Sequence, residues 1–494
     1  MTARLAGALA LAAIVVLHLV ALVRLVNRTA LDGDEAEFLH AGVRVARGER
    51  IYVDFAEHHA PILFQLLSHL DHDDLRAYVL RARALSSVCG AIALTAAAFL
   101  VWRATRRLYA PAILIGGMMA SPLIVARAFA DVRPEAPALA LFLLGALLIA
   151  SGSRRAALGA LGVGLVAFAF LINPKWPLSS LALGLVFVAG AAPARRLAFA
   201  AAAVVCALLL LAVSIDPRTY FDYVFVFNRQ IFRWTQVHGT NMTGPPQAFF
   251  FCPPMLRPPF VVPAAALVAF VAARFRNAFA EARLVWGSLL LLAASSIEIR
   301  FIYPYPVLWP QYFIVWALAA SAIFAFVPQA VVALVPPRVK PVARAVAVVF
   351  TSIAVLQGVI SMPFGGSDPA SIATAQLATI LRPGDTVFLV AKPHPLGAPD
   401  ASYYWFGFSD VVPAALEFAK TPRGRTILPP IREEDLPPCR LERGLDSHLR
   451  LIGGDSLASL PIVKACVQRL VARGILVRTR AFGVYRVRRP GELQ

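Results

Sequence analysis

The chain has 494 residues, of which 59% are hydrophobic and 15% are charged, and its mean hydropathy is +0.70. Soluble globular proteins carry roughly 25% charged residues, so the composition excludes an ordinary soluble enzyme and indicates a membrane protein. The formal net charge of +19 is informative mainly through where the charges sit, and we expect a lipid bilayer, not nucleic acid, as the partner.

Eleven apolar runs predict a polytopic α-helical membrane protein with about eleven transmembrane helices. Several runs are shorter than the ~20 residues that a span needs, so we expect their ends to extend into the flanking loops. The runs are Leu5–Val23, Ala84–Val101, Ala110–Ala126, Ala136–Ala150, Ala156–Ile172, Trp176–Pro193, Leu197–Ile215, Pro258–Ala273, Leu284–Ile297, Tyr312–Val335 and Ala345–Met362.

The loops between the runs alternate in charge. The first run follows Arg4 and is interpreted as an uncleaved signal anchor, because it is long for a signal peptide and lacks a clear cleavage site. Every second loop is short and basic, and the positive-inside rule assigns such loops to the cytoplasm. They are residues 103–107, 154–155, 195–196, 274–283 and 338–344. In the cell inner membrane, the N-terminus is then cytoplasmic and everything after Met362 lies outside.

The outer loops are longer or richer in polar and aromatic residues than the basic ones. They are residues 24–83, 129–135, 173–176, 216–247 and 298–312. Acids, histidines and tryptophans concentrate in them, and polar groups gathered on one membrane face indicate a site there.

The first outer loop opens on four acids, Asp32, Asp34, Glu35 and Glu37. Apolar and arginine residues alternate behind them, which predicts a helix lying in the membrane interface with its arginines toward the headgroups. Capping of that helix and its dipole would explain one or two acids. Four acids in so short a stretch leave a catalytic role open beside the capping role.

The next stretch, "YVDFAEHHAPILFQLL" at residues 52–67, brings Glu57, His58 and His59 together. Imidazole and carboxylate groups suit a divalent metal, which makes such an ion a candidate cofactor. Adjacent histidines on a helix point about 100° apart, which argues against both binding one ion. A polar interfacial turn, with Pro61 starting the next helix, is the alternative.

Two later outer loops carry charges at helix junctions. Asp131, Arg133 and Glu135 lie in "ADVRPE", where an Asp–Arg salt bridge or a second carboxylate for the site is expected. Lys175 lies in "LINPKW". It either snorkels to the interface or, being on the outer side against the charge bias, holds an anion such as a phosphate.

The last outer loop, residues 298–312, is aromatic and contains Glu298, Arg300 and Tyr312. Interfacial anchoring explains the aromatic residues well. The two charged residues lie near the membrane and are harder to explain by anchoring alone.

The C-terminal part has no spanning run, so we divide the chain into a membrane domain at 1–362 and an outer α/β domain at 363–494. Residues 385–391 and 475–489 alternate as strands do, and residues 459–474 form an amphipathic helix with Gly474 as its C-cap. Of the five cysteines, Cys439 and Cys466 could pair if this region faces an oxidising compartment.

Several short stretches of the chain together resemble a known family. The Asp-Glu pair after the first run, followed by "RGERIYVDFAEHHAPILFQLL", resembles the GT-C fold glycosyltransferases, in particular the bacterial branch allied to protein mannosyltransferases and aminoarabinose transferases. "ADVRPEAPALALFLLGALL", "AFLINPKWPLSSLALGL" and "WPQYFIVWALA" are similar to later segments of that branch. The matches cover most of Asp32–Val335.

The resemblance implies transfer of a sugar from a polyprenyl phosphate to a lipid, glycan or protein acceptor on the outer face, with inversion. Asp34 is then the general base, with Glu35 as its alternate, although Asp32 competes for the same motif position. Lys175 and Arg133 hold the donor phosphate, and Asp131 assists near the acceptor or a metal. Further substrate contacts are assigned to His59, Glu135, Arg300 and Tyr312.

Two other functions remain alternatives. A transporter or flippase would place polar residues inside the spans and show inverted repeats with broken helices. A non-catalytic assembly protein of the cell envelope would use the C-terminal domain for binding and tolerate changes of the first-loop acids. The sugar, the acceptor and the need for a metal do not follow from the sequence.

Overall fold

The structure is a computed structural model, and parts of the chain lie outside what it describes. Asp32, the run Leu197–Ile215, and most of Trp176–Pro193 and Ala345–Met362 are outside the described residues. Those described are 3–28, 31, 33–151, 156–182, 216–238, 252–275, 277–302, 310–342, 345, 349, 356, 377–389, 394–404, 411–453, 460–480 and 483–492.

The chain forms two compact units, each assembled from three separate stretches. The helical unit consists of Met1–Thr29, Arg83–Leu210 and Met242–Gly365. The mixed unit consists of Ala30–Ala82, Leu211–Asn241 and Gly366–Gln494. The first outer loop therefore belongs to the same unit as the C-terminal part of the chain.

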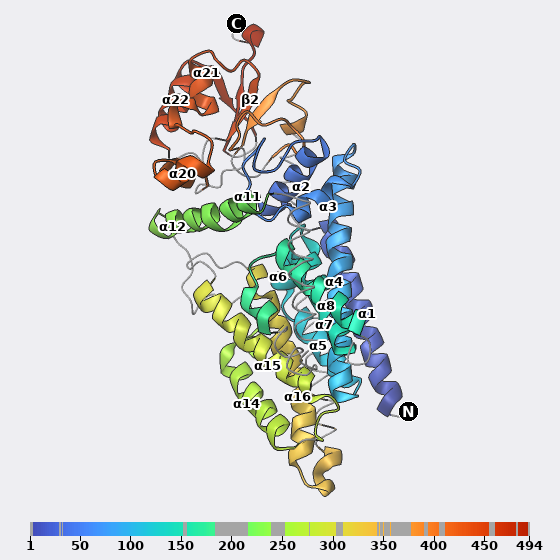
Figure 1. Ribbon diagram of the computed structural model, residues 1–494. Helices are drawn as coiled ribbons and strands as arrows, with labels where there is room; N and C mark the ends of the chain where they lie inside the picture. The colour runs from blue at the N-terminus through green and yellow to red at the C-terminus, as the bar shows by residue number, and fades with distance from the viewer. Residues whose placement is uncertain are drawn as a thin grey trace. The chain divides into compact units, whose positions relative to one another are not determined.

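The helical unit is built mainly from apolar helices (Figure 1). Helices α14, α15 and α16 pack on one another, and α16 also packs on α5. The described elements are α1 (Ala3–Arg28), α4 (Leu75–Thr105, from Arg83 onward), α5 (Tyr109–Met119), α6 (Pro122–Val125), η1 (Ala126–Ala130), α7 (Glu135–Ser151), α8 (Ala156–Ile172), η4 (Pro254–Leu256), α14 (Pro258–Arg274), α15 (Ala282–Ile297), η5 (Glu298–Ile302), η6 (Pro310–Phe313), α16 (Ile314–Leu334) and η7 (Pro337–Val339).

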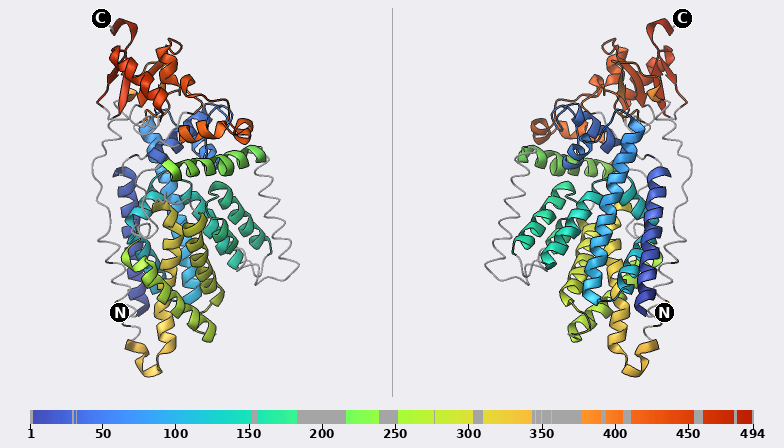
Figure 2. Two further views of the ribbon diagram at one scale, coloured as in Figure 1. Left: turned by 90° about the vertical axis from the view of Figure 1, so that its left-hand side faces the viewer. Right: turned by 90° about the vertical axis from the view of Figure 1, so that its right-hand side faces the viewer.

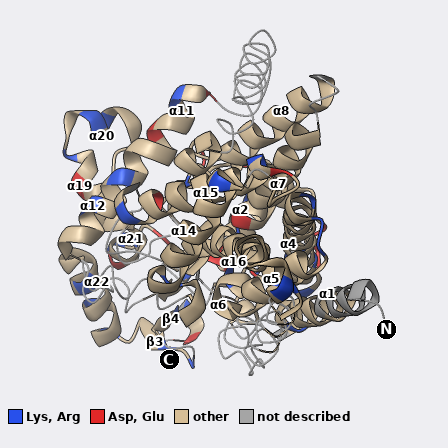
Figure 3. Ribbon diagram, turned by 90° about the horizontal axis from the view of Figure 1, so that it is seen from below, with Lys and Arg blue, Asp and Glu red and all other residues tan. Residues whose placement is uncertain are grey.

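Helices α7 and α8 lie side by side in both views of Figure 2. Small residues allow the close approach: a Cβ on Gly145 would lie 2.6 Å from the carbonyl oxygen of Gly162, and the reverse holds for Gly162. Small residues at helix crossings are typical of membrane proteins, where helices associate by packing rather than by the hydrophobic effect. Helices α5, α8 and α16 carry no charged residue and are drawn wholly tan (Figure 3).

Among the described residues, three helices are long and apolar enough to cross a membrane: Leu75–Thr105, Ala282–Phe301 and Pro310–Leu334. A fourth span results if the pair Tyr109–Met119 and Pro122–Ala130, bent by 84°, is counted as one. Four shorter apolar helices accompany them. The structure therefore supports several spans, and the expected number of eleven is not confirmed.

The mixed unit combines short helices with a small sheet. A close contact fixes α2 against its neighbours, since a Cβ on Gly42 would lie 2.5 Å from the Tyr78 hydroxyl and 2.8 Å from Leu67 Cβ. The described elements are α2 (Gly33–Ala46), α3 (Ile62–Ser68), α11 (Pro217–Phe221), η2 (Asp222–Phe227), α12 (Asn228–His238), β1 (Thr386–Phe388), α19 (Val411–Ala419), α20 (Pro422–Ile427), η8 (Glu433–Asp435), α21 (Pro437–Glu442), β2 (Leu449–Gly453), α22 (Pro461–Ala472), β3 (Leu476–Arg478), β4 (Val484–Val487) and η10 (Pro490–Glu492).

The sheet has the strand order β1-β2-β4-β3, with β1 parallel to β2 and the other two pairs antiparallel. Alternating apolar residues such as Val387 and Leu451 are fully buried in its core. The predicted strands at 385–391 and 475–489 thus exist, as does the predicted amphipathic helix. Gly474 follows that helix with φ +68°, the left-handed conformation that favours glycine at this position.

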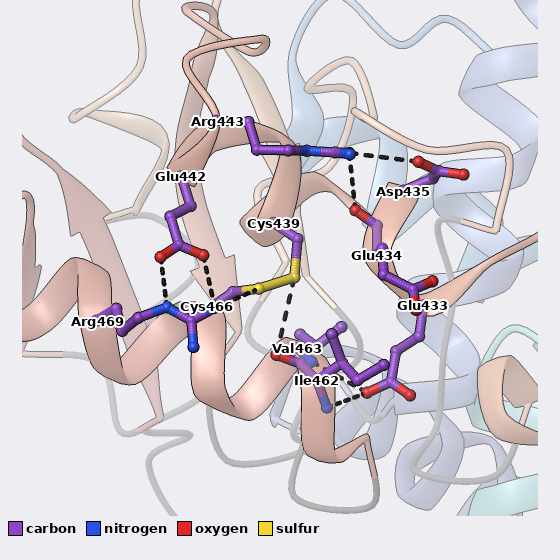
Figure 4. Close-up of a disulfide and its surroundings, with 10 residues drawn as sticks. All are labelled: Glu433, Glu434, Asp435, Cys439, Glu442, Arg443, Ile462, Val463, Cys466 and Arg469. Carbon is purple, nitrogen blue, oxygen red and sulfur yellow. Dashed lines mark hydrogen bonds and ion pairs between the residues drawn. A yellow bond between two sulfur atoms is a disulfide. The ribbon is translucent and has the colours of Figure 1, made fainter.

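One disulfide joins Cys439 of α21 to Cys466 of α22, so the pair that the sequence left open is bonded in the structure (Figure 4). Glu433 accepts hydrogen bonds from the backbone N–H groups of Ile462 and Val463 at the start of α22. An ion pair between Arg469 and Glu442 joins the same two helices. The two helices are therefore tied together by covalent and polar links.

Candidate functional site

The acidic start of the first outer loop forms the first turn of α2, as its sequence predicts. Asp34 is half-buried there, and Glu35 is fully buried. Residues three apart on a helix share a face, so Asp34 lies one turn before Glu37 on the same side, while Glu35 lies on another side. Asp32, the alternative motif position, lies outside the described residues.

Arg44 of α2 does not behave as the interfacial helix model predicted. It is buried and forms ion pairs with Glu49 and, at 2.9 Å, with Asp400. Burial of a charge requires a partner, and two carboxylates supply it here. The expectation that this arginine faces lipid headgroups is wrong, while Arg47 and Arg50 are exposed.

Four side chains form an acid–histidine cluster, defined as Glu37, Glu57, His58 and His59. One ligand atom from each lies within 4.8 Å of all the others. His59 Nδ1 is 2.9 Å from Glu57 Oε1 and 3.5 Å from Glu37 Oε1, and His58 Nδ1 is 3.6 Å from Glu57 Oε1. Glu57 Oε1 also accepts the backbone N–H groups of His58 and His59, so the loop is folded around this carboxylate.

The cluster has the chemistry of a divalent-metal site. Burial raises the pKa of Glu57, although His58 and the hydrogen bonds to the carboxylate act in the opposite direction. Glu37 is equally buried and shares a hydrogen bond with Glu57, so two carboxylates meet away from water. Such a pair needs either a proton or a cation between its members. Imidazole and carboxylate donors together suit a zinc-like or manganese-like ion.

The histidines correct one expectation. The objection to both binding one ion assumed a helix, but residues 56–60 form a loop, and α3 begins only after Pro61. In this loop the two rings lie 4.0 Å apart, and both Nδ1 atoms face the glutamates. The sequence suggested Glu57, His58 and His59 as possible metal ligands, but it did not place Glu37 with them. The three-residue spacing between Asp34 and Glu37 puts both on one face of the helix, and this spacing was the sequence signal that could have added Glu37 to the predicted site.

A second buried group in the mixed unit, His40, His394 and Asp400, is also close enough to suggest a metal. His40 Nδ1 accepts the backbone N–H of Gly397, which requires Nε2 to carry the proton that is shared with Asp400 at 2.7 Å. Burial lowers the pKa of His40 to about 4, in agreement with a neutral ring. With Arg44 already on Asp400, the group is a hydrogen-bonded structural tie rather than a metal site.

In the helical unit, the residues of "ADVRPE" lie where η1 ends and α7 begins. Asp131 is buried, with Arg127 Nη1 at 3.2 Å and Arg133 Nε at 4.0 Å from the same carboxylate oxygen. Arg133 is itself buried. The expected Asp131–Arg133 pair exists, and Arg127 joins it, so two cations face one carboxylate.

Lys175 and two other predicted substrate-binding residues lie together in the same unit. Lys175 Nζ is 3.4 Å from Glu135 Oε1 and 4.7 Å from the centre of the Tyr312 ring. Glu135 and Tyr312 are buried, whereas about a quarter of the Lys175 side chain is exposed (23%). Its ammonium is therefore held in place, yet still open to an anionic ligand. We call Arg127, Asp131, Arg133, Glu135 and Lys175 the junction residues.

The residues of the last outer loop differ in their surroundings. Glu298 is buried and accepts hydrogen bonds from the backbone N–H and hydroxyl of Ser179, which makes it a helix-start acceptor. Arg300 is exposed and stacks on Phe301, 5.3 Å from the ring centre. Of the substrate-binding residues predicted in this unit, Glu135, Lys175 and Tyr312 are thus brought together, and Arg133 joins Asp131.

The fold has known relatives. It matches the crystal structure of ArnT from Cupriavidus metallidurans bound to undecaprenyl phosphate, with a TM-score of 0.58 over 98% of each chain at 15% sequence identity. The apo structure of the same protein matches with a TM-score of 0.54 over 96% of this chain and 97% of that chain, also at 15% identity. No family model and no curated protein matches the sequence. The resemblance to the GT-C fold is confirmed at the level of the fold.

Proposed function

We propose that the chain is a membrane glycosyltransferase that moves a sugar from a polyprenyl phosphate to an acceptor on the outer face. The observation that carries the proposal is the fold, shared over nearly the whole chain with a protein solved with undecaprenyl phosphate bound. The residues proposed for the two chemical roles, a base and phosphate-binding cations, are Asp34 for the first and Lys175 with Arg133 for the second.

Asp34 acts as the general base. It takes the proton of the acceptor hydroxyl as the acceptor oxygen attacks the anomeric carbon of the donor sugar. The anomeric configuration inverts, because the new bond forms on the face opposite the departing oxygen. A half-buried carboxylate at a helix start suits this role, because it is partly accessible and a negative charge is favoured near a helix N-terminus. Glu35 is the less suitable candidate, because it is fully buried.

The leaving group is the polyprenyl phosphate. The bond between the anomeric carbon and the phosphate oxygen breaks, and the electron pair stays on that oxygen. Lys175 and Arg133 stabilise the charge that develops there. Among the junction residues three cations face two carboxylates, so the set keeps one net positive charge for a phosphate. We propose that Arg300 and Tyr312 also contact the substrate. Asp131 is proposed to assist near the acceptor.

The acid–histidine cluster is proposed to hold a divalent ion. Glu37, Glu57, His58 and His59 provide the donor atoms, and the ion would supply positive charge to orient an acceptor hydroxyl or a phosphate oxygen. His59 in this scheme contributes through the ion rather than by direct contact with the sugar. Glu57, fixed by two backbone N–H groups, keeps its carboxylate in one orientation with or without the ion.

We also propose that the N-terminus is cytoplasmic and the C-terminal part extracytoplasmic in the inner membrane. The Cys439–Cys466 disulfide supports this sidedness, because disulfides persist in oxidising compartments. Single cysteines placed at exposed Arg338 and Ser447, in a background that lacks other free cysteines, test it. In intact cells, Ser447→Cys should react with a membrane-impermeant thiol reagent and Arg338→Cys should not; the opposite pattern would reverse the orientation.

The function itself is tested by comparing extractable cell-envelope glycans by mass spectrometry with and without the gene. Loss of one sugar from one glycan or lipid is expected and would identify donor and acceptor class together. Purified protein should then bind undecaprenyl phosphate and transfer that sugar. An unchanged envelope combined with no binding of undecaprenyl phosphate would refute the proposal.

A further inference from the structure

Residues 52–59 carry three of the four members of the acid–histidine cluster, and this acid–histidine loop is held in an unusual conformation. Tyr52 has φ +67°, although it is neither glycine nor asparagine, and it is buried. Its backbone N–H donates to Phe55 O and its hydroxyl donates to His59 O at 2.6 Å, which closes the loop on itself. A residue in this backbone region persists only where the surrounding structure holds it.

Tyr403, 351 residues later than Tyr52, holds the loop from outside. Its hydroxyl donates to Tyr52 O at 2.8 Å, and its backbone carbonyl accepts the N–H of Ala56 at 2.9 Å. Both bonds go to backbone groups of the acid–histidine loop, one at the strained residue and one next to Glu57. All of these residues belong to the mixed unit.

The distances favour one orientation of the hydroxyl groups. Tyr403 has one hydroxyl proton, which goes to Tyr52 O, so its oxygen is left to accept the proton of the Tyr223 hydroxyl, also 2.8 Å away. Tyr223 in addition stacks on the Tyr52 ring, with ring centres 4.8 Å apart. The 3.1 Å contact from Tyr223 to Ile427 O is then the weaker alternative for the same proton. The arrangement directs the Tyr403 proton at the loop.

We infer that Tyr403 is a positioning residue that fixes the acid–histidine loop, so that the C-terminal part of the chain contributes to the geometry of the catalytic region. Tyr403 touches none of the four cluster side chains in the contacts that the structure gives; it acts through the backbone of Tyr52 and Ala56. The inference rests on the proposed function only for its kinetic consequence. Its structural consequence, the order of the loop, can be measured without any activity.

The test compares Tyr403→Phe with Tyr404→Phe in the purified full-length protein. Tyr404 is the matched control: it is the next residue, it is buried, and its hydroxyl donates to Pro429 O rather than to the loop. Both variants lose one hydroxyl and one hydrogen bond to a backbone carbonyl, and Tyr403→Phe also loses its bond with the Tyr223 hydroxyl. Tyr223→Phe, which removes that second bond and keeps the Tyr403 hydroxyl, controls for it. Only Tyr403→Phe removes a bond to Tyr52.

The first readout is the rate at which His58 and His59 are modified by diethyl pyrocarbonate, followed by peptide mass spectrometry. Their side chains are only 13% and 18% exposed, so a looser loop should raise the rate several-fold in Tyr403→Phe and leave it unchanged in Tyr404→Phe. Equal rates in the two variants would overturn the inference.

The second readout is kcat per donor-binding site, with the sites counted by undecaprenyl phosphate binding. Loss of a group that orients functional residues commonly costs 10–100-fold, and we expect about a tenfold lower kcat for Tyr403→Phe with unchanged donor KM. If the wild type transfers sugar but the two variants have the same kcat, the positioning role fails and the proposed function stands. If modification differs as expected but no protein transfers sugar, the proposed function fails and the positioning role stands.

Discussion

The acid–histidine cluster and the junction residues both contain buried charges, but the excess charge is negative in the first and positive in the second. In the mixed unit, the carboxylates of Glu37 and Glu57 lie together beside the imidazoles of His58 and His59. Their negative charge has to be balanced by protons or by a cation. In the helical unit, Asp131 faces two arginines and Glu135 faces one lysine, which leaves positive charge. The first region is suited to accepting protons and cations and the second to holding an anion.

The largest effect should come from the base. Asp34→Asn keeps the size and the helix-start function of the residue, because asparagine caps about as well as aspartate. Turnover should fall roughly 10²–10⁴-fold, the usual contribution of general base catalysis, while expression and thermal stability stay near wild type. Sugar transfer and thermal unfolding of the purified protein in detergent measure both.

Asp54→Asn is the control for this variant, since Asp54 lies in the same outer loop but is exposed and paired with Arg50. It should keep wild-type turnover. Asp32→Asn should also be mild; an inactive Asp32→Asn beside an active Asp34→Asn would move the base by two residues along the chain.

The next largest effect should follow from disturbing the acid–histidine cluster. Glu57→Gln removes one charged donor while keeping the hydrogen-bond acceptor for the loop N–H groups. We expect weaker binding of Mn²⁺ or Zn²⁺ and a turnover roughly 10–100-fold lower, as is usual when a metal environment is altered. A chelator should lower wild-type turnover by a similar factor and leave Glu57→Gln little changed. Full wild-type activity in the presence of chelator would show that sugar transfer needs no metal ion.

A change at Lys175 tests whether the junction residues bind the donor phosphate. Because Lys175→Met alone would leave Glu135 buried without its partner, the informative variant is Lys175→Met combined with Glu135→Gln. One charge-assisted contact contributes about 1.5–3 kcal/mol, so donor affinity should fall roughly ten- to a hundredfold relative to Glu135→Gln. Donor titration of the double variant against Glu135→Gln alone isolates the lysine. Equal affinities would make Lys175 only the partner of Glu135.

The smallest effect concerns pH and stability. Burial raises the pKa of Glu57, so between its ordinary and raised values the folded state keeps a proton that the unfolded state has lost. Metal-free protein should therefore become less stable as the pH rises through this window, by at most about 1.4 kcal/mol per pH unit for one group. Thermal unfolding across that range should show a smaller slope in Glu57→Gln. The same slope in both proteins would contradict a raised pKa.

Local patterns in the sequence predict much of this molecule. The acids before an amphipathic segment predict α2, Pro61 marks the start of α3, and Gly474 ends α22. Alternation at residues 385–391 and 475–489 predicts strands of the C-terminal sheet. Each of these signals depends on neighbours a few residues apart, and such neighbours are visible in a single sequence.

The candidate site depends on contacts that a single sequence does not show. Glu37 meets Glu57 only because α2 packs against the loop before α3, and Tyr403 meets Tyr52 across 351 residues. Arg44 is expected to face lipid headgroups on sequence grounds because its buried partner, Asp400, lies 356 residues away and cannot be recognised from the local sequence. The number of spans does not follow from apolar composition, because composition favours membrane burial but does not fix where a helix begins and ends.

The most direct test of the division between the two regions is to measure kcat and the donor dissociation constant for four proteins: wild type, Asp34→Asn, Glu135→Gln, and Lys175→Met with Glu135→Gln. We predict that Asp34→Asn loses kcat by at least about 10²-fold relative to wild type with donor binding unchanged. The double variant should bind donor at least about tenfold more weakly than Glu135→Gln and keep most of its kcat at saturation. If Asp34→Asn keeps wild-type kcat, or if both variants change only donor binding, the assignment of base and phosphate roles to these two regions is contradicted.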